Sequence, residues 1–270
     1  MACTLHFLGD FETSGQYLTD DGRLRRSLGA QNSIVEVDSG AVTILCFKAL
    51  FEWNMGEIAS CRATIAEAIS LAKELNDMHG LASALGWAAN FGYVERHPAE
   101  VDRFASELIE LSTRHHLSYW LAQGATYRGW ARSACGDTAE GIPRIEQGIR
   151  DLRATGAVLG LPHNLTLKAE ALYLADRASE ALEVINEADV LAERIELRGM
   201  FSRLRRLRAV FLATVGAEEA QIEALFCEAI RIAREQKSVS LLKRAEETYT
   251  EYRRQKMSTS EGDGFRLALL

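Results

Sequence analysis

The chain has 270 residues, of which 47% are hydrophobic and 26% charged, a balance typical of a protein with a large core or an extended repeat array. Its net charge of −7 argues against a broad surface for nucleic-acid phosphates, and no uncharged apolar run is long enough to cross a membrane. The five cysteines show no metal or redox spacing, and only three prolines interrupt a chain rich in helix formers. We therefore expect a mainly helical, cytoplasmic protein with reduced thiols.

The first residues read as the end of one helix and the turn into another. The turn is Leu8-Gly9-Asp10-Phe11-Glu12, and a polar, glycine-containing loop is expected at about 19–39. Either the chain is a fragment of a longer ancestor, or residues 2–8 form a short capping helix. An incomplete first hairpin should expose apolar surface around Leu18 and residues 44–50, and self-association through this surface is expected.

Polar turns recur every 40 residues, and each fits the junction between two helices of a hairpin. They are centred on Gly56, Arg96, Gly136, Asp176 and Gly216. Seven residues before each centre stands a small residue, as expected where two helices cross closely: Ala49, Ala89, Gly129, Ala169 and Ala209. The pattern predicts a repeated helix–helix contact.

The helix after each turn carries apolar residues four and then three positions apart, as in Val101, Ala105 and Leu108. In the last repeat this stripe is shifted by one residue, which indicates an insertion in the turn GAEEAQ. Residues 238–255 predict a final capping helix, and residues 257–270, which end in the apolar FRLALL, predict a disordered tail. The expected fold is an all-α solenoid of about six helical hairpins over residues 1–256, with a period of about 40 residues.

The turns Leu8–Glu12 and Gly136–Gly141 resemble the Gly-Asp-Tyr/Phe-Glu-Glu-Ala turn of the tetratricopeptide repeat (TPR), although that family's usual period is shorter. More specifically, AEALYLADRASEALEVINEA and GAEEAQIEALFCEAIRIAREQKSVSLLKRAEETY resemble repeats that follow a class III adenylate/guanylate cyclase domain and an ATPase in large bacterial signalling proteins. Similar arrays occur in large ATP-dependent LuxR-type transcription regulators. The resemblance covers roughly residues 3–255 and implies a non-catalytic protein-interaction scaffold, or alternatively a partner- or ligand-sensing arm.

Catalytic motifs of those larger proteins are not found in this sequence. There is no G-x-x-x-x-G-K-[ST] loop and no pair of metal-binding aspartates in a strand context. The adjacent His115 and His116 would point about 100° apart on a helix, so they predict no metal site. We expect no catalytic residue, metal or cofactor, while an enzyme assembled from distant repeats stays a third hypothesis.

The resemblance also predicts which residues line a concave binding groove, because in TPR proteins the second, fifth, ninth and twelfth positions of each first helix do so. Carried onto this register, these positions are Asn90, Tyr93, Gln123, Thr126, Trp130, His163, Thr166, Glu170, Tyr173, Arg203 and Arg206. The set is polar and aromatic, with basic residues at one end. It favours a protein or peptide partner with acidic side chains, and neither nucleic acid nor a membrane.

The arginines of RGMFSRLRRLRAVF allow two interpretations. They could pair with acidic neighbours such as Glu193 and Glu196, which is the commoner use of such residues on a helix. Alternatively, some of them could bind an acidic peptide or a phosphate.

Overall fold

The computed structural model describes residues 1–18 and 40–258. The loop expected at about 19–39 and the closing FRLALL lie outside the described residues, as does nearly all of the expected tail. Within the described ranges every regular element is a helix, so the expected all-α solenoid is confirmed. The last helix reaches Ser258, slightly past the boundary expected at residue 256.

Consecutive helices pair into hairpins along the whole array. The first hairpin joins a short helix, α1 (Ala2–Phe7), to helical residues 11–18. The following pairs are α3 (Ala41–Asn54) with α4 (Ile58–Glu74), α5 (Met78–Val94) with α6 (Pro98–Arg114), α7 (Ser118–Ala134) with α8 (Thr138–Ala154), and α9 (Leu161–Leu174) with α10 (Ala178–Arg194). A short 3₁₀ helix, η1 (Arg198–Met200), leads into α11 (Phe201–Thr214), α12 (Glu219–Glu235) and α13 (Val239–Ser258).

Left-handed residues mark the helix ends and explain the period. Residues with positive φ recur every 20 positions: Gly56, Asn76, Arg96, His116, Gly136, Gly156, Asp176, Glu196 and Gly216. Such a residue ends a helix and lets its last carbonyl groups accept hydrogen bonds from the turn. The next left-handed residue is Lys237, one position further along than the 20-residue spacing from Gly216 would place it. This shift agrees with the insertion expected in the turn at 216–221.

The small residues predicted at helix crossings are buried where the paired helices meet. Ala49, Ala89, Ala169 and Ala209 have no exposed surface. At Gly129 the two helices approach closely, because a Cβ atom placed there would lie 2.7 Å from the carbonyl oxygen of Gly141. Small side chains at one position per repeat therefore set the distance between α7 and α8 and between their equivalents.

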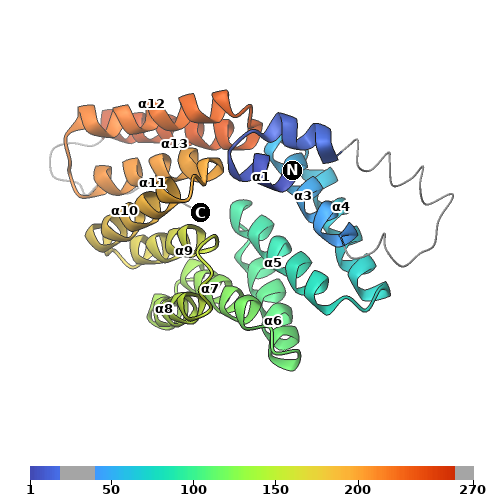
Figure 1. Ribbon diagram of the computed structural model, residues 1–270. Coiled ribbons are helices and arrows are strands. Elements are labelled where there is room, and N and C mark those ends of the chain that lie inside the picture. Colours follow the sequence, from blue (N-terminus) through green and yellow to red (C-terminus); the bar gives the residue numbers. More distant parts are fainter. Residues whose placement is uncertain (19–39, 259–270) are drawn as a thin grey trace.

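The array curves until its two ends meet, as the colour sequence around Figure 1 shows. Helix α3 packs against α13, and α1 packs against η1. Ser238 donates a hydrogen bond from Oγ to Oδ1 of Asn54 at 2.8 Å, and Ser240 donates one to the carbonyl oxygen of Trp53 at 2.5 Å. Lys237 also pairs with Glu12. We refer to these interactions between the first and last hairpins as the closure contact.

Closure corrects one expectation about the ends, the exposed apolar surface at the first hairpin. Leu18 and Leu50 were expected to be exposed, but each is only 7% exposed. Ile44 and Leu45 of the same region are partly buried against the core, so the apolar surface expected there is mostly covered. Helix α13 caps the array as expected, with Leu241, Ala245 and Tyr252 buried, and its start also packs on α3.

Candidate functional site

The inner surface of the array holds a buried cluster around one carboxylate, which we call the Glu170 cluster. Glu170, in α9, is 1% exposed and accepts hydrogen bonds from two sides. Arg96, at the end of α5, approaches its two oxygens at 2.5 and 3.0 Å. The hydroxyl of Tyr93 donates to it at 2.8 Å and the indole Nε1 of Trp130 at 3.1 Å. Side chains from three hairpins thus meet on one acidic group.

The charge state of Glu170 follows from these neighbours. Burial by itself would raise the pKa of this carboxyl group, but the charge and hydrogen bonds of Arg96 outweigh burial. Arg206 and the Tyr93 hydroxyl act in the same direction, and the pKa falls from 4.5 to about 2. Glu170 is therefore ionised at neutral pH and acts as a fixed anion rather than as a proton donor or acceptor.

Positive charge around Glu170 exceeds negative charge. The positive groups are the guanidinium groups of Arg96, Arg203, Arg206 and Arg244, and the negative groups are the carboxylates of Glu95 and Glu170. Burial and the neighbouring Arg96 and Arg244 lower the pKa of Arg206 to about 9. Burial, Arg96 and Arg203 likewise lower the pKa of Arg244 to about 10.

Three of these arginines make no ion pair among the described residues. They are Arg203, Arg206 and Arg244, and the one hydrogen bond of the Arg206 side chain goes to Oγ1 of Thr248 at 3.3 Å. Arg206 is only 4% exposed. Glu170 acts on Arg206 electrostatically but is paired directly with Arg96, so this part of the inner surface is suited to a further anionic group from a ligand.

Beside the Glu170 cluster lies a cavity of about 190 Å³, which we call the inner cavity. Inward side chains of α1, α3, α5, α7, α9, α11 and α13 surround it, so its wall comes from both ends of the array. The wall is largely aromatic and includes Trp53, Trp87, Tyr119, Trp120 and Tyr127. Arg203 joins the two regions, since it lines the cavity and lies over the Tyr93 ring at 5.5 Å.

The two histidines of the cavity wall are neutral at pH 7. Burial lowers the pKa of His6 to about 3. Burial also lowers the pKa of His163 to about 3, with a further contribution from Arg203. Nε2 of His163 lies 2.9 Å from the Tyr127 hydroxyl, which fixes the orientation of the imidazole ring.

The predicted groove residues fall into three groups. Asn90, Gln123, His163 and Arg203 line the inner cavity. Tyr93, Trp130, Glu170 and Arg206 belong to the Glu170 cluster or its surroundings. Thr126, Thr166 and Tyr173 are packed inside the hairpins, with exposed fractions of 0%, 0% and 2%, and do not line the cavity.

Two arginines of this region are missing from the sequence-based set. Arg96 was interpreted only as a turn residue, although a long basic side chain at a left-handed position otherwise held by Gly or Asp was a signal. Arg244 was left out of the inward face of the last helix. Its place three residues after the buried Leu241 would have indicated that face.

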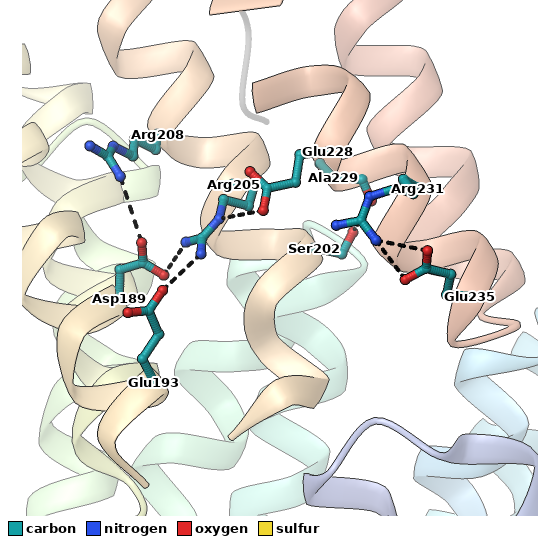
Figure 2. Close-up of polar contacts among 9 residues, drawn as sticks. All are labelled: Asp189, Glu193, Ser202, Arg205, Arg208, Glu228, Ala229, Arg231 and Glu235. Atoms are coloured by element: carbon teal, nitrogen blue, oxygen red, sulfur yellow. Dashed lines mark hydrogen bonds and ion pairs between the residues drawn. The ribbon is translucent and has the colours of Figure 1, made fainter. Parts of the chain in front are cut away.

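The outer arginines of α11 pair as the commoner interpretation predicts, and Figure 2 shows how. Arg205 binds Asp189 and Glu193 of α10 and lies 3.3 Å from a carboxylate oxygen of Glu228 in α12. Arg208 also reaches Asp189, at 3.7 Å. These contacts fasten α11 between its neighbours. Arg203 and Arg206 lie on the other face of the same helix, so the two interpretations apply to different residues.

No set of three or more His, Cys, Asp or Glu side chains in residues 1–18 and 40–258 is placed to hold a metal ion. His115 and His116 lie at the end of α6, and His116 is its left-handed residue. All five cysteines are free, with Cys46 and Cys61 buried. In the same ranges, no helix combines the length and apolar character that crossing a membrane requires.

Comparison with known proteins shows the fold. Residues 40–95 and 200–256 match the family model of anaphase-promoting complex subunit 5. The crystal structure of PlcR from Bacillus thuringiensis, in complex with the peptide PapR7 and DNA, has a TM-score of 0.61 at 16% identity, over 83% of this chain and 75% of that chain. BtubC (BKLC) from P. vanneervenii has a TM-score of 0.52 at 12% identity, over 97% and 96%. The chain is therefore a TPR-like helical repeat array.

A sequence relative is much longer than this chain. An uncharacterized protein of Rhizobium meliloti (strain 1021) is 27% identical over 203 residues. The match covers 75% of this chain but 20% of the relative. The similar region is thus one part of a larger protein there.

Proposed function

We propose that the chain is a non-catalytic interaction scaffold that binds a peptide segment with acidic side chains on its inner surface. The observation that carries this proposal is the excess of arginine around the Glu170 cluster. Arg203, Arg206 and Arg244 form no direct ion pair among the described residues, while the nearby Glu170 is paired with Arg96, and an acidic side chain of a partner would supply a direct contact. Hydrogen bonds between a guanidinium and a carboxylate are among the stronger polar contacts in proteins.

The larger setting of this scaffold is the second part of the proposal. We place it as the repeat arm of a signalling protein of the cyclase–ATPase type, which the sequence resemblance implies. The length of the Rhizobium meliloti relative, of which the match covers 20%, agrees with an arm that belongs to a longer protein. Sequencing the neighbouring coding region tests this setting, because a cyclase domain and a P-loop upstream are expected.

The binding proposal is tested with fluorescently labelled peptides and the full chain. One peptide alternates Glu or Asp with aliphatic residues, and its partner replaces every Glu and Asp by Gln or Asn. Fluorescence anisotropy should show at least about tenfold tighter binding of the acidic peptide, decreasing as salt is raised from about 50 to 300 mM.

Arginine variants show where on the array the acidic peptide binds. Arg203→Gln with Arg244→Gln should weaken the acidic peptide at least about tenfold, since each loses a charge-assisted contact worth about 1.5–3 kcal/mol. Arg114→Gln with Arg231→Gln is the matched control, because both arginines are exposed on outer helices. The proposal is wrong if the inner and outer pairs have equal effects, or if the neutral peptide binds as tightly as the acidic one.

The alternative is the partner- or ligand-sensing arm of a large LuxR-type transcription regulator. The inner cavity favours it, since a scaffold for an extended peptide needs no cavity bounded by both ends of the array. PlcR, which shares the fold, was crystallised with a peptide and DNA. A helix-turn-helix downstream in the coding sequence would support this alternative over the cyclase setting.

A further inference from the structure

The inner cavity has a composition that an acidic peptide does not explain. Its wall contains no aspartate or glutamate, and Arg203 supplies its one guanidinium. Both wall histidines are neutral, because burial lowers the pKa of His6 and of His163 to about 3. The cavity therefore presents one positive charge in an otherwise neutral and mostly apolar surface.

Arg203 and Asn90 are polar groups of the wall that are left for a ligand. Arg203 makes no ion pair or hydrogen bond among the described residues and is held by its contact with the Tyr93 ring, 5.5 Å from the ring centre. Asn90, which is 8% exposed, has no hydrogen-bond partner for its amide in the same ranges. Among the other polar side chains of the wall, His6 leaves its Nδ1 atom without a hydrogen-bond partner, whereas Gln123 and Tyr127 are engaged. The amide of Gln123 bonds to Tyr119 and Asn164, and the Tyr127 hydroxyl bonds to His163.

The volume sets the size of the apolar part of a ligand. The cavity measures about 190 Å³. An engineered apolar cavity of about 150 Å³ is large enough to bind benzene. A cavity of this size therefore has room for one aromatic ring or a short acyl chain.

We propose that the inner cavity is a binding site for a small carboxylate with an apolar body the size of one aromatic ring or a short acyl chain. The carboxylate pairs with Arg203 and accepts a hydrogen bond from the Asn90 amide, while the apolar body packs against the tryptophans. One negative charge matches the single guanidinium, whereas a phosphate dianion would leave a charge uncompensated in an apolar wall. This site goes beyond peptide binding and makes the chain a small-molecule receptor.

Ring closure is part of this site. Phe7 and Phe11 from the first hairpin and Leu241 from α13 belong to the same wall. The wall is complete only when the closure contact is formed, so a bound carboxylate stabilises the closed array by mass action.

The test uses isothermal titration calorimetry of the full chain with phenylacetate and hexanoate, each compared with its neutral amide. At least one carboxylate should bind about tenfold or more tightly than its amide, because only the carboxylate pairs with Arg203. Arg203→Gln should make the two affinities equal, and Arg203→Lys should retain part of the preference. Circular dichroism establishes that each variant is folded.

Arg244→Gln separates this proposal from the peptide proposal. Arg244 does not line the inner cavity, so its replacement should leave phenylacetate affinity unchanged while weakening the acidic peptide. The proposal is overturned by equal affinities of carboxylate and amide for the native chain, or by a carboxylate preference that survives in folded Arg203→Gln. It is also overturned if no probe saturates the chain at concentrations up to about 10 mM.

Discussion

Replacing Glu170 by glutamine removes the central anion of the Glu170 cluster while keeping its shape. The amide oxygen can still accept from Tyr93 or Trp130, but Arg96 loses both carboxylate contacts. Breaking a buried ion pair by removing one partner costs about 3–5 kcal/mol. The pKa of Glu170 gives a second estimate, because a fall from 4.5 to about 2 corresponds to about 3 kcal/mol at neutral pH. We therefore expect Glu170→Gln to lower the free energy of unfolding by about 3 kcal/mol.

The pH dependence of this difference has a definite sign. The pKa of Glu170 is lower in the folded state than in the unfolded state, so ionisation stabilises the fold. The stabilisation is fully present above pH 4.5 and is lost as the pH falls towards 2. The difference between the native chain and Glu170→Gln should be constant near neutral pH and shrink below pH 4.5.

Urea denaturation followed by circular dichroism, at several pH values from neutral to acidic, measures this difference. Glu180→Gln is the control, since Glu180 is an exposed carboxylate paired with Arg177, and its midpoint should match that of the native chain. A loss below about 1 kcal/mol for Glu170→Gln at pH 7 would refute the reasoning, because a surface ion pair would account for it. A difference that stays constant down to pH 3 would refute the assigned pKa.

Three further predictions concern other parts of the array. The pKa of His163 is lowered to about 3, so protonation favours the unfolded state, and stability should fall as the pH drops from 6.5 towards 3. His163→Gln should reduce that slope by up to about 1.4 kcal/mol per pH unit in acid denaturation; an unchanged slope would contradict the burial argument. Gly129→Ala should destabilise the chain by about 1–3 kcal/mol in urea denaturation, because the added Cβ would meet Gly141. This loss exceeds the gain of about 1 kcal/mol that alanine brings to a helix. Greater stability of the variant would show that α7 and α8 can separate. Ser238→Ala should cost about 1–2 kcal/mol through the lost bond to Asn54, and an unchanged thermal midpoint would show that the closure contact contributes little.

Most of the local structure could be predicted from the sequence because it repeats. A left-handed turn residue such as Gly136 and a small crossing residue such as Gly129 are required by local geometry, and each recurs at the same step. The two roles of the arginines in α11 could also be predicted from the sequence. Arg205 and Arg206 are adjacent in sequence but point to different faces of the helix, one to acidic neighbours and the other inward.

Closure was not predictable in the same way. It joins Asn54 to Ser238, and whether they meet depends on a small rotation added at every hairpin in between. An error of a few degrees per repeat would separate the two ends. The same accumulation brings Arg96, Glu170 and Arg206 together from three different hairpins, so their pairing could not be read from the period alone.

Closure also changes how the array should lose its structure. In an open row of repeats, each end unit has one neighbour and frays before the middle. Here the bond from Ser238 to Asn54 gives both end units a second neighbour, so the row becomes a cycle. Fraying at any position of a cycle must first break two interfaces instead of one. The hairpins should therefore melt as one cooperative unit. Breaking the closure contact should restore the graded unfolding of a linear repeat protein.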